Sequence, residues 1–486
     1  MLLFMILLPI LGSCLLTINN FKTTSVLMKV ISLISSGATF ILNFIIAIKF
    51  DYSYKGYQFI CDLLHGFSIG VDGLSLPLIL LTSFLFLLCT VFSLFNMKIY
   101  NLRRFIALLL LLEGLTIGVF ASLDIIMFYI FFESVLIPMF FIIGIWGHED
   151  RIYATFKLFL YTLAGSLLFL IAIIYIYLFS DKVSSIEQLS YILPNFLNIK
   201  AQKWLWCAFF ISFAIKIPIV PFHTWLPNAH VQAPTVGSVL LAGILIKVGT
   251  YALLRFSIPM LPEANMYFSN FVIILSIIGV IYASLISFVQ SNIKKFIAYS
   301  SIAHMGFVTA GIFSFNEYGI SGAIFQMISH GLISAALFFC VGMLYDRNHT
   351  LEISKYSGLA KVMPKFSIMF IFFTMASIAL PGTSGFVGEF LSILGVFHYS
   401  KLFAALIATG VILGAVYMLF LSKEIIWGAP NSSLIVCDLN KNELFILIIL
   451  ATLVLVFGIY PYYILLKSLS PFMEQLSLRN LYFSSI

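Results

Sequence analysis

The sequence predicts an all-α polytopic membrane protein, and two observations support that prediction. Of the 486 residues, 62% are hydrophobic and only 9% are charged, and the mean hydropathy is +1.11. Such a composition excludes a soluble globular domain. Apolar runs of about 20 residues recur along the whole chain, and each is long enough to cross about 30 Å of hydrocarbon.

The expected elements are about fourteen transmembrane helices. They are expected at residues 2–19, 26–48, 74–95, 104–121, 124–146, 154–179, 204–226, 234–256, 270–289, 294–314, 319–344, 366–398, 403–426 and 444–466. The first run has neither a basic start nor a cleavage site, so we interpret it as a helix rather than a signal peptide.

Basic residues concentrate on one side of the membrane if the connections between spans alternate. That side collects Lys22, Lys29, Lys98, Arg103, Arg104, Arg151, Lys157, Lys294, Lys295, Arg347, Lys355, Lys361, Lys365, Lys423 and Lys441. The other side has only Lys49, Lys55, Lys182, Lys200, Lys203, Lys401, Lys467 and Arg479, with Arg255 near its edge. The basic side is therefore predicted to be cytoplasm or matrix, with both termini facing outward. The net charge of +7 reflects topology, and no nucleic acid is expected as a partner.

The sequence shows no motif for a metal or a nucleotide. The six cysteines lack any CxxC spacing; they are Cys14, Cys61, Cys89, Cys207, Cys340 and Cys437. Zinc or iron–sulfur ligation is therefore not expected. No Walker motif occurs, and Gly382, Gly385 and Gly388 do not have the spacing of a dinucleotide-binding loop.

Lys216 stands in the segment FFISFAIKIPIVPFHTWLP, where it interrupts an apolar span. A lysine in the middle of a membrane helix costs several kcal/mol unless it has a partner or water. Pro218 and Pro221 follow, and because each lacks a backbone N–H they should leave the carbonyls of Ala214 and Ile217 unpaired. A charge beside a broken helix at membrane depth is typical of the ion sites of transporters.

Six further ionisable residues lie inside the expected spans, where such residues are functional candidates by default. They are Glu113, Glu133, Lys247, His304, His330 and Glu389. Each also has a structural interpretation: the glutamates could hydrogen bond between helices, the histidines could be satisfied core residues, and the lysine could extend to an interface. The segment around Lys247 contains no proline, so we expect an uninterrupted helix there.

Glu389 marks a second broken helix. Pro381 and the glycines at 382, 385 and 388 weaken the segment SIALPGTSGFVGEFLSILG. This is the twelfth expected span, five after the span of Lys216, and such spacing indicates two repeated units. We therefore predict two inverted five-helix repeats, spans 4–8 and 9–13, with spans 7 and 12 broken. The corresponding segments are 1–103, 104–256, 257–427 and 428–486.

Several long motifs resemble a known family. AFFISFAIKIPIVPFHTWLPNAHVQAPTVGSVLLAGILIKVGTYALLRF, KKFIAYSSIAHMGFV, QMISHGLISAALFFCVGMLYDR and LPGTSGFVGEF are similar to the antiporter-like subunits of respiratory NADH–quinone oxidoreductase, complex I. The similarity covers about residues 65–425. The block FFESVLIPMFFIIGIWG and the glutamate at 389, where the sibling subunits carry lysine, resemble the subunit M branch, called chain 4 in mitochondria.

The resemblance implies a proton path. Glu133 would pair with Lys216 and modulate its proton affinity. Lys247, His304 and His330 would continue a polar axis through the membrane, and Glu389 would exchange protons with the outward side. Glu113 has no agreed role in the family.

The resemblance also implies partners and cofactors. The partners would be other membrane-arm subunits of complex I, including two sibling antiporter-like subunits on either side, and membrane lipids. This chain would bind no cofactor, whereas NADH, FMN, iron–sulfur clusters and quinone would be held by partner subunits. An Mrp-type Na⁺/H⁺ antiporter subunit shares the fold and is the alternative function. A quinone-binding redox subunit is disfavoured because no cofactor ligands are found.

Composition bears on localisation. The 51 phenylalanines, with abundant isoleucine, lysine and asparagine, are typical of an AT-rich genome. Such a genome fits a mitochondrion or a reduced endosymbiont bacterium, and the missing targeting peptide suits an organelle-encoded chain and a bacterial one equally. We expect the mitochondrial inner membrane, with a bacterial inner membrane as the alternative.

Overall fold

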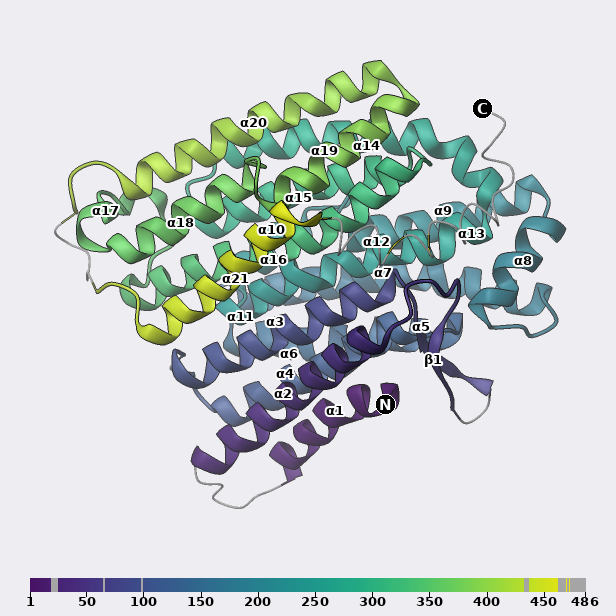
Figure 1. Ribbon diagram of the computed structural model, residues 1–486, viewed down its shortest axis with the longest axis horizontal. Helices are drawn as coiled ribbons and strands as arrows, with labels where there is room; N and C mark the ends of the chain where they lie inside the picture. Colours follow the sequence, from purple (N-terminus) through teal and green to yellow (C-terminus); the bar gives the residue numbers. More distant parts are fainter. Residues whose placement is uncertain are drawn as a thin grey trace.

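The computed structural model describes residues 1–18, 25–63, 66–97, 99–431 and 437–461, together with Leu469 and Phe472. Four residues of the charge analysis lie outside these described residues: Lys22, Lys98, Lys467 and Arg479. The helices run side by side as a bundle, with the N-terminal helices along one edge and α20 (Lys401–Ile426) along the opposite edge (Figure 1).

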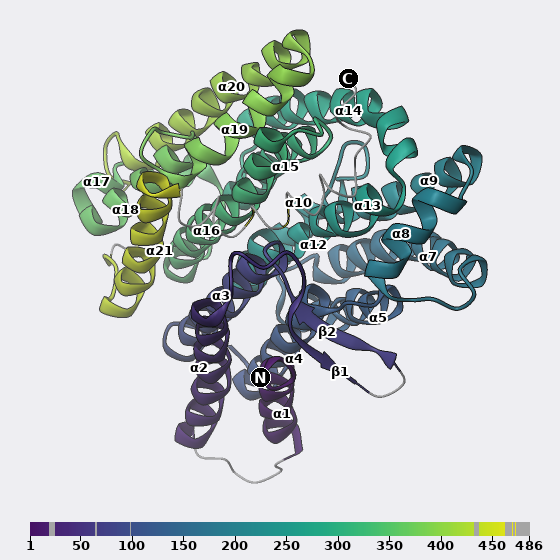
Figure 2. The ribbon, with the colours of Figure 1, turned by 45° about the vertical axis from the view of Figure 1, so that its right-hand side comes forward.

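The elements follow one another along the chain with few polar connections. The first half contains α1 (Leu2–Ile18), α2 (Ser25–Lys49), β1 (Gln58–Asp62), β2 (Ser68–Val71), α3 (Ser75–Phe95), α4 (Leu102–Ala121), α5 (Ile125–Ser134), α6 (Leu136–Trp146), α7 (Arg151–Phe179), α8 (Ile186–Phe196), α9 (Ile199–Lys216), α10 (Trp225–Gln232), α11 (Thr235–Leu240), η2 (Leu241–Leu245), α12 (Ile246–Ala252), η3 (Leu253–Ser257) and α13 (Ile258–Met260). The second half contains α14 (Pro262–Phe288), α15 (Ile293–Ile312), α16 (Glu317–Asn348), η4 (Ile353–Lys355), α17 (Leu359–Val362), α18 (Pro364–Ser377), α19 (Ser384–Tyr399), α20 and α21 (Lys441–Ile459). Figure 2 shows α8 and α9 on the side of the bundle opposite α18 and α21.

The predicted helical membrane fold is confirmed. Within the described residues, ten helices or unbroken helical runs are long and apolar enough to cross a membrane, and α1 and α18 are shorter apolar helices. Helices predominate because hydrocarbon offers no water to the backbone, so every N–H and C=O must find its partner within the segment. The total of fourteen spans, their grouping into inverted repeats and the four-segment division remain predictions.

A small antiparallel sheet is an addition that the all-α prediction did not include. β1 and β2 pair with Cys61 opposite Ile69 and Asp62 opposite Ser68. The sheet is joined to the end of α4, because the Leu123 N–H donates to the carbonyl of Ser68 at 3.1 Å. This hydrogen bond holds the loop between α2 and α3, which contains the sheet, against the end of α4.

A buried ion pair ties this loop to the helical run of Lys247. Asp72 follows β2, and its carboxylate accepts two hydrogen bonds from the Arg255 guanidinium at 2.6 and 2.7 Å. The Tyr251 hydroxyl accepts from Arg255 Nε at 3.1 Å and donates to the carbonyl of Phe120. Both charged groups are buried, so each depends on the other.

Replacing Asp72 with asparagine is expected to lower the free energy of unfolding by about 3–5 kcal/mol, because it leaves a buried guanidinium without its counter-charge. The midpoint of thermal unfolding in detergent measures this effect. Glu352→Gln is the control, since Glu352 and Lys355 form an exposed pair worth at most about 1 kcal/mol. Equal losses in the two variants would contradict the role given to the buried pair.

Both predicted helix breaks are present. α9 ends at Lys216, and the chain continues in turns until α10 begins at Trp225. α18 ends at Ser377, and α19 begins at Ser384 after a short turn in which Ala379 and Gly382 have positive φ. The first break places Lys216 at the end of α9, where carbonyls lack intrahelical partners, and the second places Glu389 in the second turn of α19.

Candidate functional site

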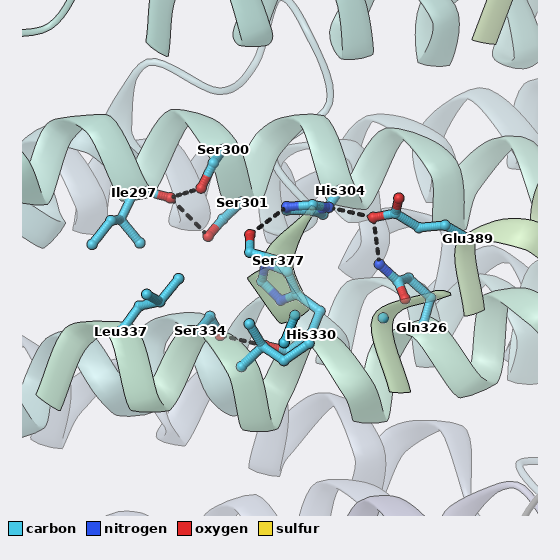
Figure 3. A pocket seen from close by; sticks show the side chains of 13 residues that line it. Ile297, Ser300, Ser301, His304, Gln326, His330, Ser334, Leu337, Ser377 and Glu389 are labelled. Atoms are coloured by element: carbon cyan, nitrogen blue, oxygen red, sulfur yellow. Dashed lines mark hydrogen bonds and ion pairs between the residues drawn. The ribbon is translucent and has the colours of Figure 1, made fainter. Parts of the chain in front are cut away.

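Four helical elements of the second half surround a cluster of polar side chains (Figure 3). His304 lies on α15, His330 on α16 and Glu389 on α19, and all three are buried. His304 Nδ1 lies 2.6 Å from Glu389 Oε1, so the two form a hydrogen-bonded pair. The His304 and His330 rings are neighbours, and their centroids lie 5.5 Å apart. The structure therefore brings together three of the six predicted site residues here.

Two neutral residues complete this cluster. Ser377, the last residue of α18, lies with its hydroxyl 3.2 Å from His304 Nε2. Gln326, one turn before His330 on α16, donates its amide N–H to Glu389 Oε1 at 3.0 Å. Neither residue was predicted from the sequence, because a neutral polar side chain inside a span is not costly enough to draw attention.

A small cavity lies among these residues. It is lined by both histidines, Glu389 and four serines, Ser300, Ser301, Ser334 and Ser377. Its volume, counted as the space that the centre of a water molecule can occupy, is about 10 Å³. This is about the volume that one water needs, and the lining offers more than two hydrogen-bonding groups. The cavity therefore suits a single water beside the histidine pair.

Lys247 extends the line of polar groups toward the first half of the chain. It is fully buried, and its Nζ lies 2.8 Å from His330 Nδ1. The ammonium also donates to the carbonyl of Ala242. Lys247, His330, His304 and Glu389 thus form one continuous sequence of side-chain neighbours.

The helix around Lys247 is continuous from Thr235 to Met260, as expected, but it contains two π-helical segments that the sequence did not predict. The π-helical segment η2 ends two residues before Lys247, and a second one, η3, begins six residues after it. A π-helical turn shifts the backbone hydrogen-bond pattern, and the carbonyl that Lys247 bonds belongs to η2. No proline causes these turns, so the sequence offered no signal for them.

Lys216 lies apart from that line. It is buried at the end of α9, its Nζ has no hydrogen-bond partner, and it stands 4.5 Å from the centre of the Phe132 ring. Glu133 is adjacent to Phe132 and close enough for its charge to act on Lys216. The expected pairing is therefore electrostatic here, without a hydrogen bond between the two groups.

The backbone at the first break differs from the prediction in one detail. The carbonyl of Ala214 is not free, because it accepts from the Ile219 N–H at 2.8 Å. The side chain of Trp225 donates to the carbonyl of Ile215 at 2.8 Å. The two prolines break the helix as expected. The carbonyls of its last turn are nevertheless hydrogen bonded, one by the Ile219 N–H and one by the Trp225 indole.

Two further buried basic residues, His230 and Lys294, lie between Lys247 and the basic side. His230 on α10 is fully buried with neither ring nitrogen hydrogen bonded, and its ring stacks on Phe338. Lys294, assigned to the basic surface in the charge analysis, is buried and donates to the carbonyl of Ala233 at 2.6 Å. The charges of both Lys294 and Lys247 act on His230. Sequence analysis missed His230, because a histidine in the polar-rich segment after the first break carries no cost that would single it out.

His148 lies in the loop between α6 and α7, outside the spans. Burial and the charge of Lys294 lower its pKa from 6.5 to about 4. Its Nδ1 lies 3.1 Å from the Tyr345 hydroxyl at the end of α16. His148 is thus neutral near pH 7 and adds no positive charge to this side.

Glu113 does not join the cluster. It is fully buried on α4, and both of its carboxyl oxygens lack hydrogen-bond partners. Among the described residues, no group of three or more His, Cys, Asp or Glu side chains is arranged to hold a metal ion.

Two broken helices with buried charges and a line of polar side chains between them define an antiporter-like membrane protein. The family model described as NADH:quinone oxidoreductase/Mrp antiporter matches residues 122–414, which is more than half of the chain. The chain belongs to this family.

Individual relatives narrow the comparison. Over 457 residues the chain is 50% identical to NADH-quinone oxidoreductase subunit M of Rickettsia prowazekii (strain Madrid E), covering 92% of each. It is 47% identical to NADH-ubiquinone oxidoreductase chain 4 of Marchantia polymorpha, covering 94% of this chain and 93% of the relative. The predicted resemblance to the subunit M and chain 4 branch is confirmed, and both relatives fit a multi-span membrane location.

Solved structures agree with the fold. A chain of respiratory complex I from Thermus thermophilus superposes with a TM-score of 0.88 at 31% identity, covering 99% of both chains. A chain of the Mrp complex from Dietzia sp. DQ12-45-1b superposes with a TM-score of 0.89 at 18% identity, covering 100% of this chain and 98% of the other. The second likeness concerns the fold alone.

Proposed function

We propose that this chain is a proton-translocating membrane subunit of a respiratory NADH:quinone oxidoreductase. The observation that supports the proposal most is the line from Lys247 through His330 and His304 to Glu389. Two of its links, Lys247–His330 and His304–Glu389, are within hydrogen-bond distance. Ionisable groups at membrane depth that face one another are the usual components of a proton relay.

The remaining link between the histidines is bridged by water in this proposal. The ring centroids are 5.5 Å apart, and the adjoining cavity has room for about one water. A water there would accept a proton from one ring and donate to the other. The serines that line the cavity would hold that water in place.

Glu133 and Lys216 form the other half of the path. Moving one proton against an assumed potential of ~150 mV requires about 3.5 kcal/mol, or a swing in proton affinity of about 2.5 pKa units. In the structure Lys216 Nζ is buried and has no hydrogen-bonding partner. Movement of the Glu133 carboxylate toward and away from Lys216 would supply such a swing.

Redox chemistry takes place elsewhere in this proposal. The chain contributes the translocase part of the enzyme, and the partner subunits hold NADH, FMN, iron–sulfur clusters and quinone. Its partners would be other membrane-arm subunits, with a sibling antiporter-like subunit on either side and lipids around them. Copurification of the chain with NADH dehydrogenase activity supports this assignment, and a complex without that activity overturns it.

An Mrp-type Na⁺/H⁺ antiporter subunit remains the alternative function, because the fold is shared. Glu389, in place of the lysine of the sibling subunits, favours the oxidoreductase. The alternative predicts proton movement that depends on sodium and proceeds without NADH. The proposed function predicts NADH-driven movement that does not require sodium.

Replacing Glu133 with alanine is expected to lower NADH-driven proton translocation by about tenfold, because Lys216 loses the charge that acts on it. Proton uptake by inverted membrane vesicles, normalised to assembled complex, measures the effect. Glu187→Ala on α8 is the control, since Glu187 is exposed. If the Glu133 variant assembles normally and keeps the wild-type proton-to-electron ratio, the role of Glu133 is refuted.

A further inference from the structure

Gln326 has an unused hydrogen-bonding atom directly beside the last group of the proposed path. Its amide N–H donates to Glu389 Oε1 at 3.0 Å, whereas its own Oε1 is buried and has no partner. A buried acceptor left unpaired is costly. The amide therefore offers an acceptor that the present state of Glu389 does not use (Figure 3).

The packing of α16 against α19 holds this amide close to Glu389. Gly388 precedes Glu389, and a Cβ at that position would lie 2.8 Å from the Gln326 Cα and would also collide with the side chain. A side chain at 388 would therefore push the amide out of its place. Because residue 388 is a glycine, Gln326 packs directly against the turn of α19 that carries the Glu389 carboxyl group.

Glu389 Oε1 is shared by two donors in the structure. His304 Nδ1 lies at 2.6 Å and Gln326 Nε2 at 3.0 Å from the same oxygen. Both contacts suit an ionised carboxylate, which only accepts hydrogen bonds. When a proton passes from the His304 imidazolium to Glu389, the N–H bond breaks and an O–H bond forms, leaving a neutral imidazole and a neutral carboxylic acid. That acid needs an acceptor.

We propose that Gln326 is a positioning residue that serves Glu389 in both protonation states. It donates its N–H to the carboxylate, and it accepts the O–H of the acid with its own oxygen after the amide turns over. The terminal torsion of glutamine is broad and roughly two-fold, so this turn is accessible. The acid proton then points away from His304, which hinders its return and leaves Glu389 ready to release it outward.

The inference rests on the proposed function, since it presumes that Glu389 carries protons. The titratable groups around the amide are His304 on α15, His330 on α16 itself and Glu389 on α19, with Lys247 on α12 beyond His330 and Tyr417 on α20 near Glu389. Ser377 at the end of α18 is neutral. Only Gln326 among the lining residues pairs a donated hydrogen bond to Glu389 with an unpaired acceptor, as far as the described residues show.

The test compares three variants in inverted membrane vesicles that carry the assembled oxidoreductase. Gln326→Met keeps the volume but removes donor and acceptor, and we expect NADH-driven proton translocation to fall about tenfold at every pH. Gln326→Glu can donate and accept only while protonated. It should reach within about twofold of the wild-type rate at acidic pH and lose activity as pH rises and the two carboxylates repel each other.

Gln202→Met is the matched control. Gln202 on α9 is also a buried glutamine with an unpaired Oε1, but it bonds the backbone of Leu197, away from the polar line. It should translocate protons at the wild-type rate. Rates are normalised to the amount of assembled complex. A variant that only folds poorly therefore yields less complex but keeps the wild-type turnover per complex.

Three results would overturn the inference. One is wild-type turnover of Gln326→Met, which would make the residue a space filler. Another is the same pH profile for Gln326→Met and Gln326→Glu. The third is failure of both Gln326 variants to assemble while the control assembles, which would assign the residue to folding. Glu389→Ala is run alongside: if that variant pumps normally the proposed function fails, whereas a loss there with normal Gln326→Met refutes only this inference.

Discussion

Replacing Glu389 with alanine is expected to lower proton translocation through this subunit by about 100-fold, the usual contribution of a positioned proton-transfer group. The change removes the oxygen that both His304 and Gln326 bond. A proton on His304 then has no acceptor beyond Ser377 and the cavity. The expected readout is a lower proton-to-electron ratio of the assembled complex in inverted vesicles.

The control for this prediction is Glu352→Ala, because Glu352 is exposed in its pair with Lys355. It removes the same charge without touching the polar line. An unchanged ratio for Glu389→Ala, with normal assembly, would show that protons do not leave through this carboxyl group. A loss of the same size in the control would point to a nonspecific effect of charge.

Replacing Lys247 with methionine is expected to reduce translocation by a similar factor of about 100. Lys247 is the member of the line that stands between the two halves of the chain, and its Nζ lies 2.8 Å from His330. Methionine has similar length but neither binds nor donates a proton. The carbonyl of Ala242 also loses its partner, so assembly must be measured together with turnover.

Lys200→Met supplies the comparison for this variant, since Lys200 is exposed in the first turn of α9. It should leave both assembly and proton translocation unchanged. If Lys247→Met assembles and translocates protons at the control rate, the two halves are not connected through this residue. The line of side chains would then be a structural feature only.

Much of the fold could be predicted because the membrane imposes simple rules. Span length follows from hydrocarbon thickness, and prolines with glycines locate the two breaks. The sequence therefore predicted that α9 would end near Lys216 and that the helix before Glu389 would be interrupted. It did not predict the β1–β2 sheet, whose strands are short and lie in a polar loop, or the π-helical segments around Lys247.

The site was predicted as far as ionisable residues are concerned. A charge inside an apolar span is costly, and this cost drew attention to Lys247, His304, His330 and Glu389, which the structure places in one line. The neutral Gln326 and Ser377 carry no such cost. His230 stood in a polar-rich segment where a histidine is unremarkable, and only the bundle shows how close it lies to Lys247.

The first half of the path depends on distances that no sequence pattern gives. Glu133 and Lys216 lie on separate helices, and the Lys216 ammonium stands 4.5 Å from the centre of the Phe132 ring. Lys216 Nζ has no hydrogen-bond partner in the structure, and the proposed path requires Glu133 to approach it and to withdraw.

The most direct test of the account is the proton-to-electron ratio of the assembled oxidoreductase carrying Glu389→Ala and Lys247→Met together, measured in inverted vesicles during NADH oxidation. If both residues belong to one path, the double variant should lose no more translocation than either single variant, because effects on a shared path do not add. A double variant whose loss is the product of the two single losses, or singles with the wild-type ratio, would contradict a single proton path through this chain.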